Sequence, residues 1–187
     1  MTMRPKRMSI KKCIPILEYM TTGLNLHLPF SIFVEGRYPE RDIYTNVEND
    51  GIAKLGHHSI EQAQLFPIPD SYDIHPYKID FPWMIETPNG YSSIYVQPQN
   101  ELYDIMLFPR GLVNTDNYKN QVNFPFFLKK DFTGTIDAGT HFMSVFFIKR
   151  EKEEFVFNEF EKGKDKILQA KSMVQNWGRH FYKNTRF

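Results

Sequence analysis

The sequence predicts a mainly β fold: a single-domain sandwich or jelly roll, or a β-clip-like barrel, with an irregular N-terminal region and a C-terminal amphipathic helix. Aromatic residues make up 16% of the chain, with 17 Phe and 10 Tyr, and aromatic residues are enriched in strands. Short apolar segments also alternate with turn signals through the middle of the sequence, a pattern typical of sandwiches and barrels. A change to helical periodicity near the C-terminus predicts the helix.

Residues 1–75 are predicted to form an irregular region that wraps around the rest of the protein. Short apolar runs alternate here with clusters of Pro, Gly, Asn and Asp, which favour turns. The overlapping segment 65–82, LFPIPDSYDIHPYKIDFP, contains four prolines. Because proline lacks a backbone donor, this segment is expected to form neither a long helix nor a central strand.

Residues 76–151 are predicted to form the β core. Seven short segments are expected to be strands, since turn signals such as TPNG, PRG and DAG bound them. The predicted strands are 83–86, 92–97, 102–108, 111–115, 124–128, 132–136 and 141–150.

Residues 152–187 are predicted to form a helical extension with one apolar face. Apolar residues recur there at intervals of three and four, which is the spacing of an amphipathic helix. Trp177 and Phe181 are the predicted interface residues, because the apolar stripe is expected to dock on the protein or on a neighbour. The stripe consists of Ile167, Ala170, Val174, Trp177 and Phe181.

Charge and cysteine content restrict the classes of partner. The formal net charge is +1, so the whole molecule lacks the basic character expected of a protein that binds nucleic acid or a membrane surface. The only cysteine, Cys13, excludes an internal disulfide and fits a reducing compartment. It lies among apolar residues and is expected to be buried. No apolar run is long enough for a membrane span, so no membrane partner is expected.

Four segments of the chain form a recognisable pattern: KIDFPWMIETPNGYS (78–92), GLVNTDNY (111–118), VNFPFF (122–127) and FTGTIDAGTHFMSVFFIKRE (132–151). Together they resemble an uncharacterised family of tailed phages, notably those of marine cyanobacteria, and of scattered bacteria. The resemblance implies a phage origin, a β fold and a location in the host cytoplasm or the virion, but no mechanism. Asn114 replaces the family's aspartate, and His141 and Phe146 replace prolines.

The segment GTIDAGTH, residues 134–141, is also similar to the segment that carries the catalytic aspartate of dUTPase-type enzymes. In those enzymes a phosphate loop lies upstream, of which only Pro-Arg-Gly at 109–111 is present, and their glycine-rich C-terminal arm is missing. A second partial match places Asn114 at the catalytic acid, and an amide cannot act as a general base. We therefore interpret the segment as a structural β-hairpin, with Asp137 in the turn and Gly139 at a positive φ.

The segment RGLVNTDNYKNQVN, residues 110–123, is the predicted ligand-facing rim, because polar residues gather there between two apolar strands. If the protein is catalytic, Asp116 and Asp137 are the candidate carboxylates and Arg110 supplies positive charge. Asp116 is also expected to accept backbone hydrogen bonds in a turn. The candidate ligand-binding residues are Arg110, Asn114, Asp116 and Asn123.

No metal site and no cofactor are predicted. The sequence has neither the His-x-Asp nor the His-x-His pair expected of an iron site on a jelly roll. The best alternative is His58 with Glu61, which would share one face of a helix. A third ligand, His75 or His141, would have to come from the tertiary structure.

Three classes of function follow. The favoured class is a structural or interaction protein, such as a virion or assembly component, whose β core forms a homo-oligomer and whose arms bind other virion or host proteins. The alternative is a small-molecule or nucleotide-acting auxiliary metabolic enzyme on a dUTPase-like or cupin-like scaffold. A nucleic-acid binder using the basic C-terminal helix is the third and least favoured, since interleaved acidic residues fit a solvated helix face.

Overall fold

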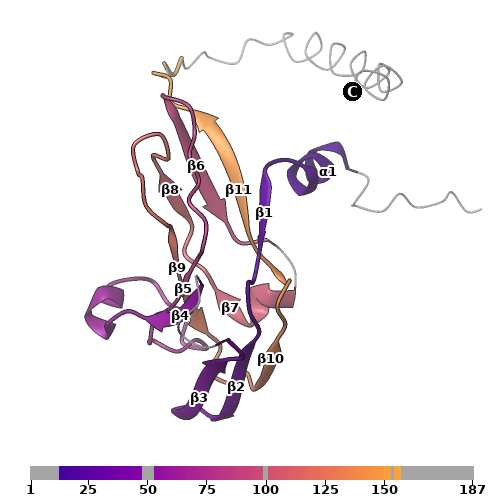
Figure 1. Cartoon of the computed structure of the whole chain (residues 1–187), viewed down its shortest axis with the longest axis vertical. Helices are drawn as coiled ribbons and strands as arrows, with labels where there is room; N and C mark the ends of the chain where they lie inside the picture. The colour runs from indigo at the N-terminus through magenta and orange to yellow at the C-terminus, as the bar shows by residue number, and fades with distance from the viewer. Residues whose placement is uncertain (1–12, 48–52, 99–100, 153, 157–187) are drawn as a thin grey trace, which may run out of the picture. The chain divides into compact units, whose positions relative to one another are not determined.

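The chain divides into two compact units, Met1–Glu151 and Lys152–Phe187, and the fold described below belongs to the first. Figure 1 shows a computed structural model, which describes residues 13–47, 53–98, 101–152 and 154–156. The predicted helix with Trp177 and Phe181 lies outside the described residues.

The described part of the first unit contains three antiparallel sheets, which confirms the prediction of a mainly β fold. The first sheet has the order β1-β11-β6-β8, the second β10-β2-β3 and the third β4-β5-β9-β7. Each described sheet ends in two different strands, so none closes on itself and the barrel alternative is wrong. The strands are β1 (Leu24–His27), β2 (Ile32–Arg37), β3 (Glu40–Thr45), β4 (Lys54–His57), β5 (Tyr77–Asp80), β6 (Tyr91–Val96), β7 (Met106–Leu107), β8 (Gly111–Val113), β9 (Asn123–Leu128), β10 (Gly134–Ile136) and β11 (His141–Lys149).

Aromatic side chains join the first and third sheets into a sandwich. Phe142 on β11 lies edge-on to Phe124 on β9, with ring centroids 5.2 Å apart, and Tyr95 on β6 lies 5.6 Å from Phe124. Phe108, which follows β7, contacts both Phe126 and Phe142. The high aromatic content of the sequence is therefore used in the core, where such rings combine large buried area with favourable edge-to-face packing.

The N-terminal region is more regular than the sequence predicts, and the expectation that residues 1–75 lack regular structure is wrong. Strands β1 to β4 all lie in this region. β1 pairs with β11, and β2 pairs with both β3 and β10. These strands are only four to six residues long and therefore leave little periodicity to recognise. The prolines taken as evidence against strands lie in the connections between them.

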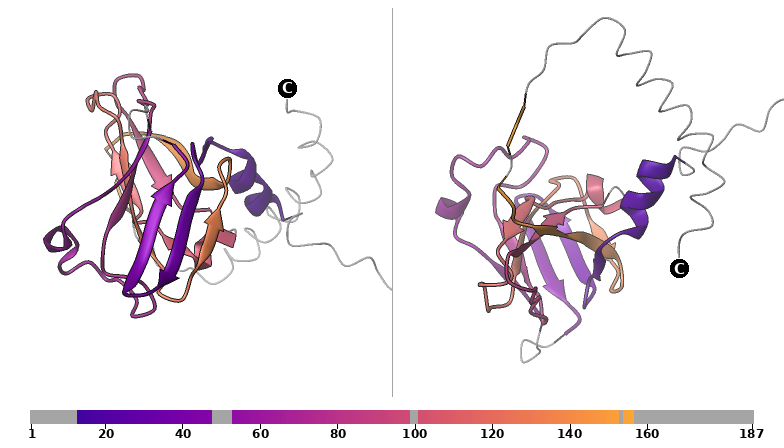
Figure 2. Two further views of the ribbon diagram at one scale, coloured as in Figure 1. Left: turned by 60° about the horizontal axis from the view of Figure 1, so that its bottom comes forward. Right: turned by 90° about the horizontal axis from the view of Figure 1, so that it is seen from above.

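Helices contribute little to the described core. α1 (Ile14–Thr21) begins after Cys13, has Pro15 in its first turn and buries none of its residues. Figure 2 shows α1 at the surface of the unit. Cys13 itself is exposed, which corrects the prediction that it is buried. The described residues also form two short 3-10 helices, η2 (Ile60–Ala63) and η3 (Glu101–Asp104), which lie in connections. No described helix has the length and apolar character that crossing a membrane requires.

The segment GTIDAGTH joins two sheets and is not a β-hairpin. β10 pairs with β2 in the second sheet, whereas β11 pairs with β1 and β6 in the first. Gly139 has φ +82°, which confirms the predicted left-handed turn residue. The turn is attached to the segment before β2, since the Gly139 amide donates to the Leu28 carbonyl at 2.8 Å and the Leu28 amide donates to the Thr140 carbonyl at 2.9 Å.

One of the seven strands predicted for residues 76–151 is absent. Residues 83–86 form an irregular connection in which Trp83 is 68% exposed. Pro82 and Pro88 flank this segment, and each removes a backbone donor that a strand would need. β5, which immediately precedes this segment, is a strand that the sequence analysis missed.

Candidate functional site

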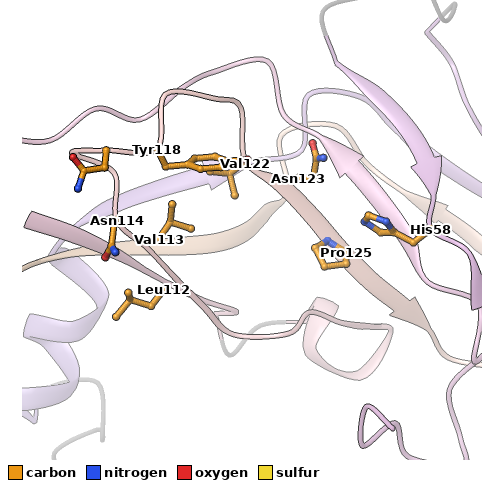
Figure 3. A pocket seen from close by; sticks show the side chains of 9 residues that line it. His58, Leu112, Val113, Asn114, Tyr118, Val122, Asn123 and Pro125 are labelled. Atoms are coloured by element: carbon orange, nitrogen blue, oxygen red, sulfur yellow. The ribbon is translucent and has the colours of Figure 1, made fainter. Parts of the chain in front are cut away.

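A cleft of about 720 Å³ opens between β8 and β9 (Figure 3). We call it the β8–β9 cleft. Its polar lining comes mainly from the loop that joins these two strands, and Pro125 on β9 forms part of its wall. The lining residues are His58, Leu112, Val113, Asn114, Asn117, Tyr118, Val122, Asn123 and Pro125.

The cleft follows from the way the chain changes sheet. β8 belongs to the first sheet and β9 to the third, so two strands that are consecutive in sequence do not pair. A turn reverses the chain after β8, because the Asn114 carbonyl accepts the amides of Asn117 and Tyr118 at 2.9 and 2.8 Å. The chain then enters β9 at Asn123, and the space between the diverging strands becomes the cleft.

The lining of the cleft is suited to a ligand with neutral hydrogen-bonding groups. Three of the nine described lining residues are asparagines, and none of the nine is a carboxylate, lysine or arginine. An asparagine side chain offers both donors and an acceptor without a net charge. His58 contributes a ring at the β9 side of the cleft (Figure 3), and its Nδ1 atom lies 2.8 Å from Oε1 of Gln62.

Asp116 does not line the cleft, because it forms an ion pair with Arg150. Oδ1 accepts a hydrogen bond from Nη1 of Arg150 at 2.9 Å, and Oδ2 accepts one from Nη2. Oδ2 also accepts the Gly90 amide at 2.8 Å, in accord with the expectation that Asp116 accepts backbone hydrogen bonds. The Asp116 carboxylate therefore connects the turn at Gly90 to Arg150 at the end of β11.

Hydroxyl groups extend this ion pair into a buried network. The Thr115 hydroxyl lies 2.8 Å from that of Thr87 and 2.9 Å from that of Ser93. The Ser92 hydroxyl donates to Asn114 at 2.8 Å and accepts from Nη1 of Arg150 at 3.0 Å. Ser92, Ser93 and Thr115 are completely buried, so these bonds satisfy groups that would otherwise destabilise the fold.

The hydrogen bonds from Arg150, together with the Gly90 amide, lower the pKa of Asp116 to about 2. The carboxylate is therefore ionised at neutral pH, as an ion pair requires. A general acid or base works best with a pKa near the operating pH. The geometry places Asp116 in an ion pair that joins segments distant in the sequence.

Asp73, a second buried carboxylate, also forms an ion pair with an arginine. Asp73 accepts hydrogen bonds from Arg41 at 3.0 Å and from the amide and ring of His75 at 3.0 and 2.8 Å. Burial alone would raise the pKa of Asp73, but the hydrogen bonds from His75 and the charge of Arg41 outweigh it and lower the pKa. Nη1 of Arg41 also donates to the Lys129 carbonyl at 2.8 Å, so the pair connects β3 to the end of β9.

The structure brings together only part of the predicted site. Asn114 and Asn123 line the β8–β9 cleft, while Arg110 is exposed and lines an adjoining pocket. Asp137 is exposed in the turn between β10 and β11, where its carbonyl accepts the Thr140 hydroxyl at 2.7 Å. Arg110 forms no ion pair with Asp116, whose partner is Arg150, so the predicted combination of Asp116, Asp137 and Arg110 does not form.

The histidines do not assemble as a metal site in the described part of the chain. His58 precedes η2 and contacts Gln62, so the predicted pairing with Glu61 on one helical face is wrong. His75 contacts Asp73, and Nε2 of His141 lies 3.1 Å from the Met143 carbonyl. No group of three or more His, Cys, Asp or Glu side chains converges among the described residues.

Sequence reasoning missed Arg150 and Arg41, the cations that pair with Asp116 and Asp73. Pairing of β11 with β6 places Arg150 beside the Gly90 turn, where its amide donates to the Gly90 carbonyl at 2.7 Å. An arginine at the end of a strand carries no local pattern that identifies its partner. The two basic residues that close the last predicted strand, Lys149 and Arg150, were the only local signal.

Comparison with known proteins adds no family assignment. No protein-family model matches the sequence, and no match was found among the curated proteins.

Proposed function

We propose that this protein is a structural or interaction protein, a virion or assembly component of the tailed-phage type, whose β core forms a homo-oligomer. The supporting observation is an apolar row on the first sheet. Phe146, Ile94 and Leu112 lie directly opposite one another on β11, β6 and β8. They lie outside the buried core, and Leu112 is 57% exposed. We call these three residues the outer row.

Helix α1 extends the outer row beyond the sheet. The Tyr19 ring stacks on the Phe146 ring with centroids 5.2 Å apart. Leu17 and Met20, on the same helix, are 46% and 55% exposed. Apolar side chains thus continue from α1 across the sheet to its edge strand, and a contiguous exposed apolar surface is typical of protein–protein contacts.

A second copy of the chain is the occupant that this surface fits. β8 is an edge strand of the first sheet, so it can pair with β8 of a copy related by a two-fold axis. Such pairing would bring the Leu112 side chains of the two copies together at the axis. The contact would satisfy backbone groups and remove apolar surface from water at the same time.

The two aspartate–arginine ion pairs also support binding over hydrolysis. Asp116 and Asp73 are held by arginines, and none of the described residues that line the β8–β9 cleft is a carboxylate. The protein is proposed to act through its surface, in the host cytoplasm or the virion. Other virion or host proteins are the alternative partners for the outer row.

Light scattering coupled to size-exclusion chromatography tests the proposal. The full chain is expected to elute as an oligomer whose mass falls on dilution, because association depends on protein concentration. Leu112→Glu should shift it toward the monomer. Burial of a leucine contributes about 1.5–3 kcal/mol, so the variant should associate roughly ten- to a hundredfold more weakly.

Leu65→Glu is the matched control, because Leu65 is fully exposed and lies outside the outer row. This variant should retain the mass of the wild type. A wild-type chain that stays monomeric over a hundredfold dilution would contradict the proposal. If Leu112→Glu has the melting temperature and the oligomeric mass of the wild type, the copies associate through a surface other than the outer row.

A further inference from the structure

Three asparagine side chains bring unused hydrogen-bonding groups to the β8–β9 cleft. Asn114, Asn117 and Asn123 all line the cleft, and all three are exposed. Oδ1 of Asn114 accepts the Ser92 hydroxyl at 2.8 Å, which leaves its Nδ2 group without a partner among the described residues. In the same described part of the chain, the side-chain amides of Asn117 and Asn123 form no hydrogen bond. Each of the three amides can therefore donate to a ligand, and two of them can also accept.

The asparagines lie toward the two ends of a wall that is apolar in the middle. In Figure 3, Asn114 lies on the left of the cleft and Asn123 on the right. Val113 and Val122 line the cleft between them. A ligand in the cleft would therefore meet amide groups at both ends and C–H groups in between.

The Tyr118 ring adds a flat aromatic surface to the cleft. Tyr118 is one of the lining residues and is 43% exposed. Its hydroxyl donates to the Gln121 carbonyl at 3.4 Å, which holds the ring at its edge. The face of an aromatic ring carries partial negative charge. It therefore attracts the C–H groups of a saturated ring, which carry partial positive charge.

The lack of charge in the lining restricts the ligand further. Charged residues make up 24% of the sequence, yet none of the nine described lining residues is a carboxylate, lysine or arginine. A charged ligand would lose water in the cleft without gaining an opposite charge, which is unfavourable. The ligand that fits is neutral, carries many hydrogen-bonding groups and has an apolar face. Sugar rings combine these properties, because each hydroxyl both donates and accepts and the ring presents C–H groups on its faces.

We propose that the β8–β9 cleft binds a neutral oligosaccharide. The amides of Asn114, Asn117 and Asn123 bond to its hydroxyls, and Tyr118 packs against the C–H face of a sugar ring. The cleft volume of about 720 Å³ falls within the range of about 300–1,000 Å³ found for small-molecule sites. This site goes beyond the proposed function and does not rest on it. Because Leu112 belongs to both the cleft and the outer row, the test leaves Leu112 unchanged.

Ligand-observed saturation-transfer NMR on the full chain tests the site. The probes are three neutral trisaccharides, maltotriose, cellotriose and chitotriose, with trigalacturonate as a charged sugar and N-acetyl-trialanine amide as a neutral peptide. We expect at least one neutral trisaccharide to bind with a Kd of about 1 mM or below, as a few neutral hydrogen bonds and one ring contact allow. Trigalacturonate and the peptide should bind several-fold more weakly, because the first is charged and the second has neither hydroxyls nor a saturated ring.

Single substitutions assign the contacts. Asn117→Ala and Asn123→Ala should each weaken the best trisaccharide roughly two- to tenfold, as expected for loss of a neutral hydrogen bond. Tyr118→Ala should weaken it by a similar factor, whereas Tyr118→Phe keeps the ring and should bind like the wild type. Asn120→Ala is the matched control, because Asn120 is exposed and lies in the same loop but is not among the described lining residues. It should leave the affinity unchanged.

Three results would overturn the proposal. The first is the absence of saturation transfer to all three neutral trisaccharides at several millimolar. The second is sugar binding that stays unchanged in Asn117→Ala, Asn123→Ala and Tyr118→Ala, which would place the sugar on another surface. The third is binding of trigalacturonate or the peptide as tight as that of the best neutral sugar. Selective weakening in the three variants, with unchanged melting temperature, would support the assignment.

The same variants separate this site from the proposed oligomer. None of the substitutions changes a residue of the outer row, so each variant should keep the oligomeric mass of the wild type in light scattering. The sugar site and the proposed self-association can therefore fail independently.

Discussion

At the scale of single residues, Asp116 shows how a polar side chain is used to join distant segments. Its carboxylate binds Arg150 and the Gly90 amide, and the adjacent Thr115 hydroxyl contacts Thr87 and Ser93. Three segments that are distant in the sequence therefore meet at one buried point. Removal of one partner leaves the others with unsatisfied groups, and such losses are costly in buried sites.

Asp116→Asn should remove a pH-dependent part of the stability. The folded-state pKa is about 2, below the value of about 3.9 for an unfolded aspartate. The ionised form thus stabilises the protein above about pH 4, and this contribution is lost as the pH falls from about 4 to 2. Thermal melting between these limits and at neutral pH measures the effect.

In Asp116→Asn the melting temperature should be lower at neutral pH and should fall less between pH 4 and 2 than in the wild type. Asp70→Asn is the control, because Asp70 is exposed and has no ion pair among the described residues. Equal acid sensitivity of Asp116→Asn and the wild type would contradict the assigned ion pair.

Asp137→Asn tests the remaining enzymatic hypothesis. Asp137 contributes its backbone carbonyl to the turn, and its carboxylate is exposed. We expect the variant to unfold within about 0.5 kcal/mol of the wild type, as is usual for surface substitutions. Nucleoside triphosphates with magnesium should yield no pyrophosphate with either protein. If the wild type hydrolyses a nucleoside triphosphate and Asp137→Asn loses this activity while still folding normally, the dUTPase-like alternative would be favoured.

At the scale of elements, the connection from α1 to β1 depends on a close backbone approach. Gly23 has φ +86°, and a Cβ atom at this position would lie 2.2 Å from the Val145 carbonyl oxygen. The same atom would lie 3.3 Å from the Phe146 ring, on which Tyr19 stacks. A glycine is therefore required where the chain leaves α1 and enters β1 beside β11.

Gly23→Ala and Gly139→Ala separate steric contact from backbone strain. Both glycines have φ above +80°, but a Cβ at Gly139 would meet nothing within 4 Å. Gly139→Ala should therefore destabilise the protein by about 1–2 kcal/mol, the usual cost of the left-handed conformation. Gly23→Ala should cost distinctly more, because it adds a clash with the backbone. Denaturant unfolding measures both, and equal losses would contradict the close approach at Gly23.

At the scale of the whole molecule, the described hydrophobic core lies entirely within the first compact unit. Core residues run from Leu26 to Val145 and come from all three sheets. The outer row, by contrast, remains exposed or half-exposed. This difference separates the surface that stabilises the fold from the surface proposed to bind a second copy.

A chain that ends at Glu151 should fold on its own. It keeps the described core and Arg150, the partner of Asp116. Its unfolding in denaturant should be cooperative, with the single transition expected of a small domain. Circular dichroism and fluorescence should report the same midpoint. Loss of a cooperative transition would contradict the assignment of a complete core to this unit.

The sequence alone was sufficient to predict the mainly β fold and most strands after residue 90. Turn signals and apolar runs occur close together there, so segments such as 92–97 and 124–128 could be located from local pattern. The left-handed Gly139 was predictable for the same reason, because the conformation of a turn depends mainly on its own residues. Asn114 and Asn123 were also predicted to share a ligand-facing rim.

Only the tertiary structure decided which residues meet across the fold. It paired β1 with β11 and sent β10 and β11 into different sheets, so a segment that resembles a hairpin became a link between sheets. It also paired Asp116 with Arg150 and not with Arg110. Local patterns record conformational preference within a few residues. Strand partners and ion pairs depend instead on contacts between segments far apart in the chain.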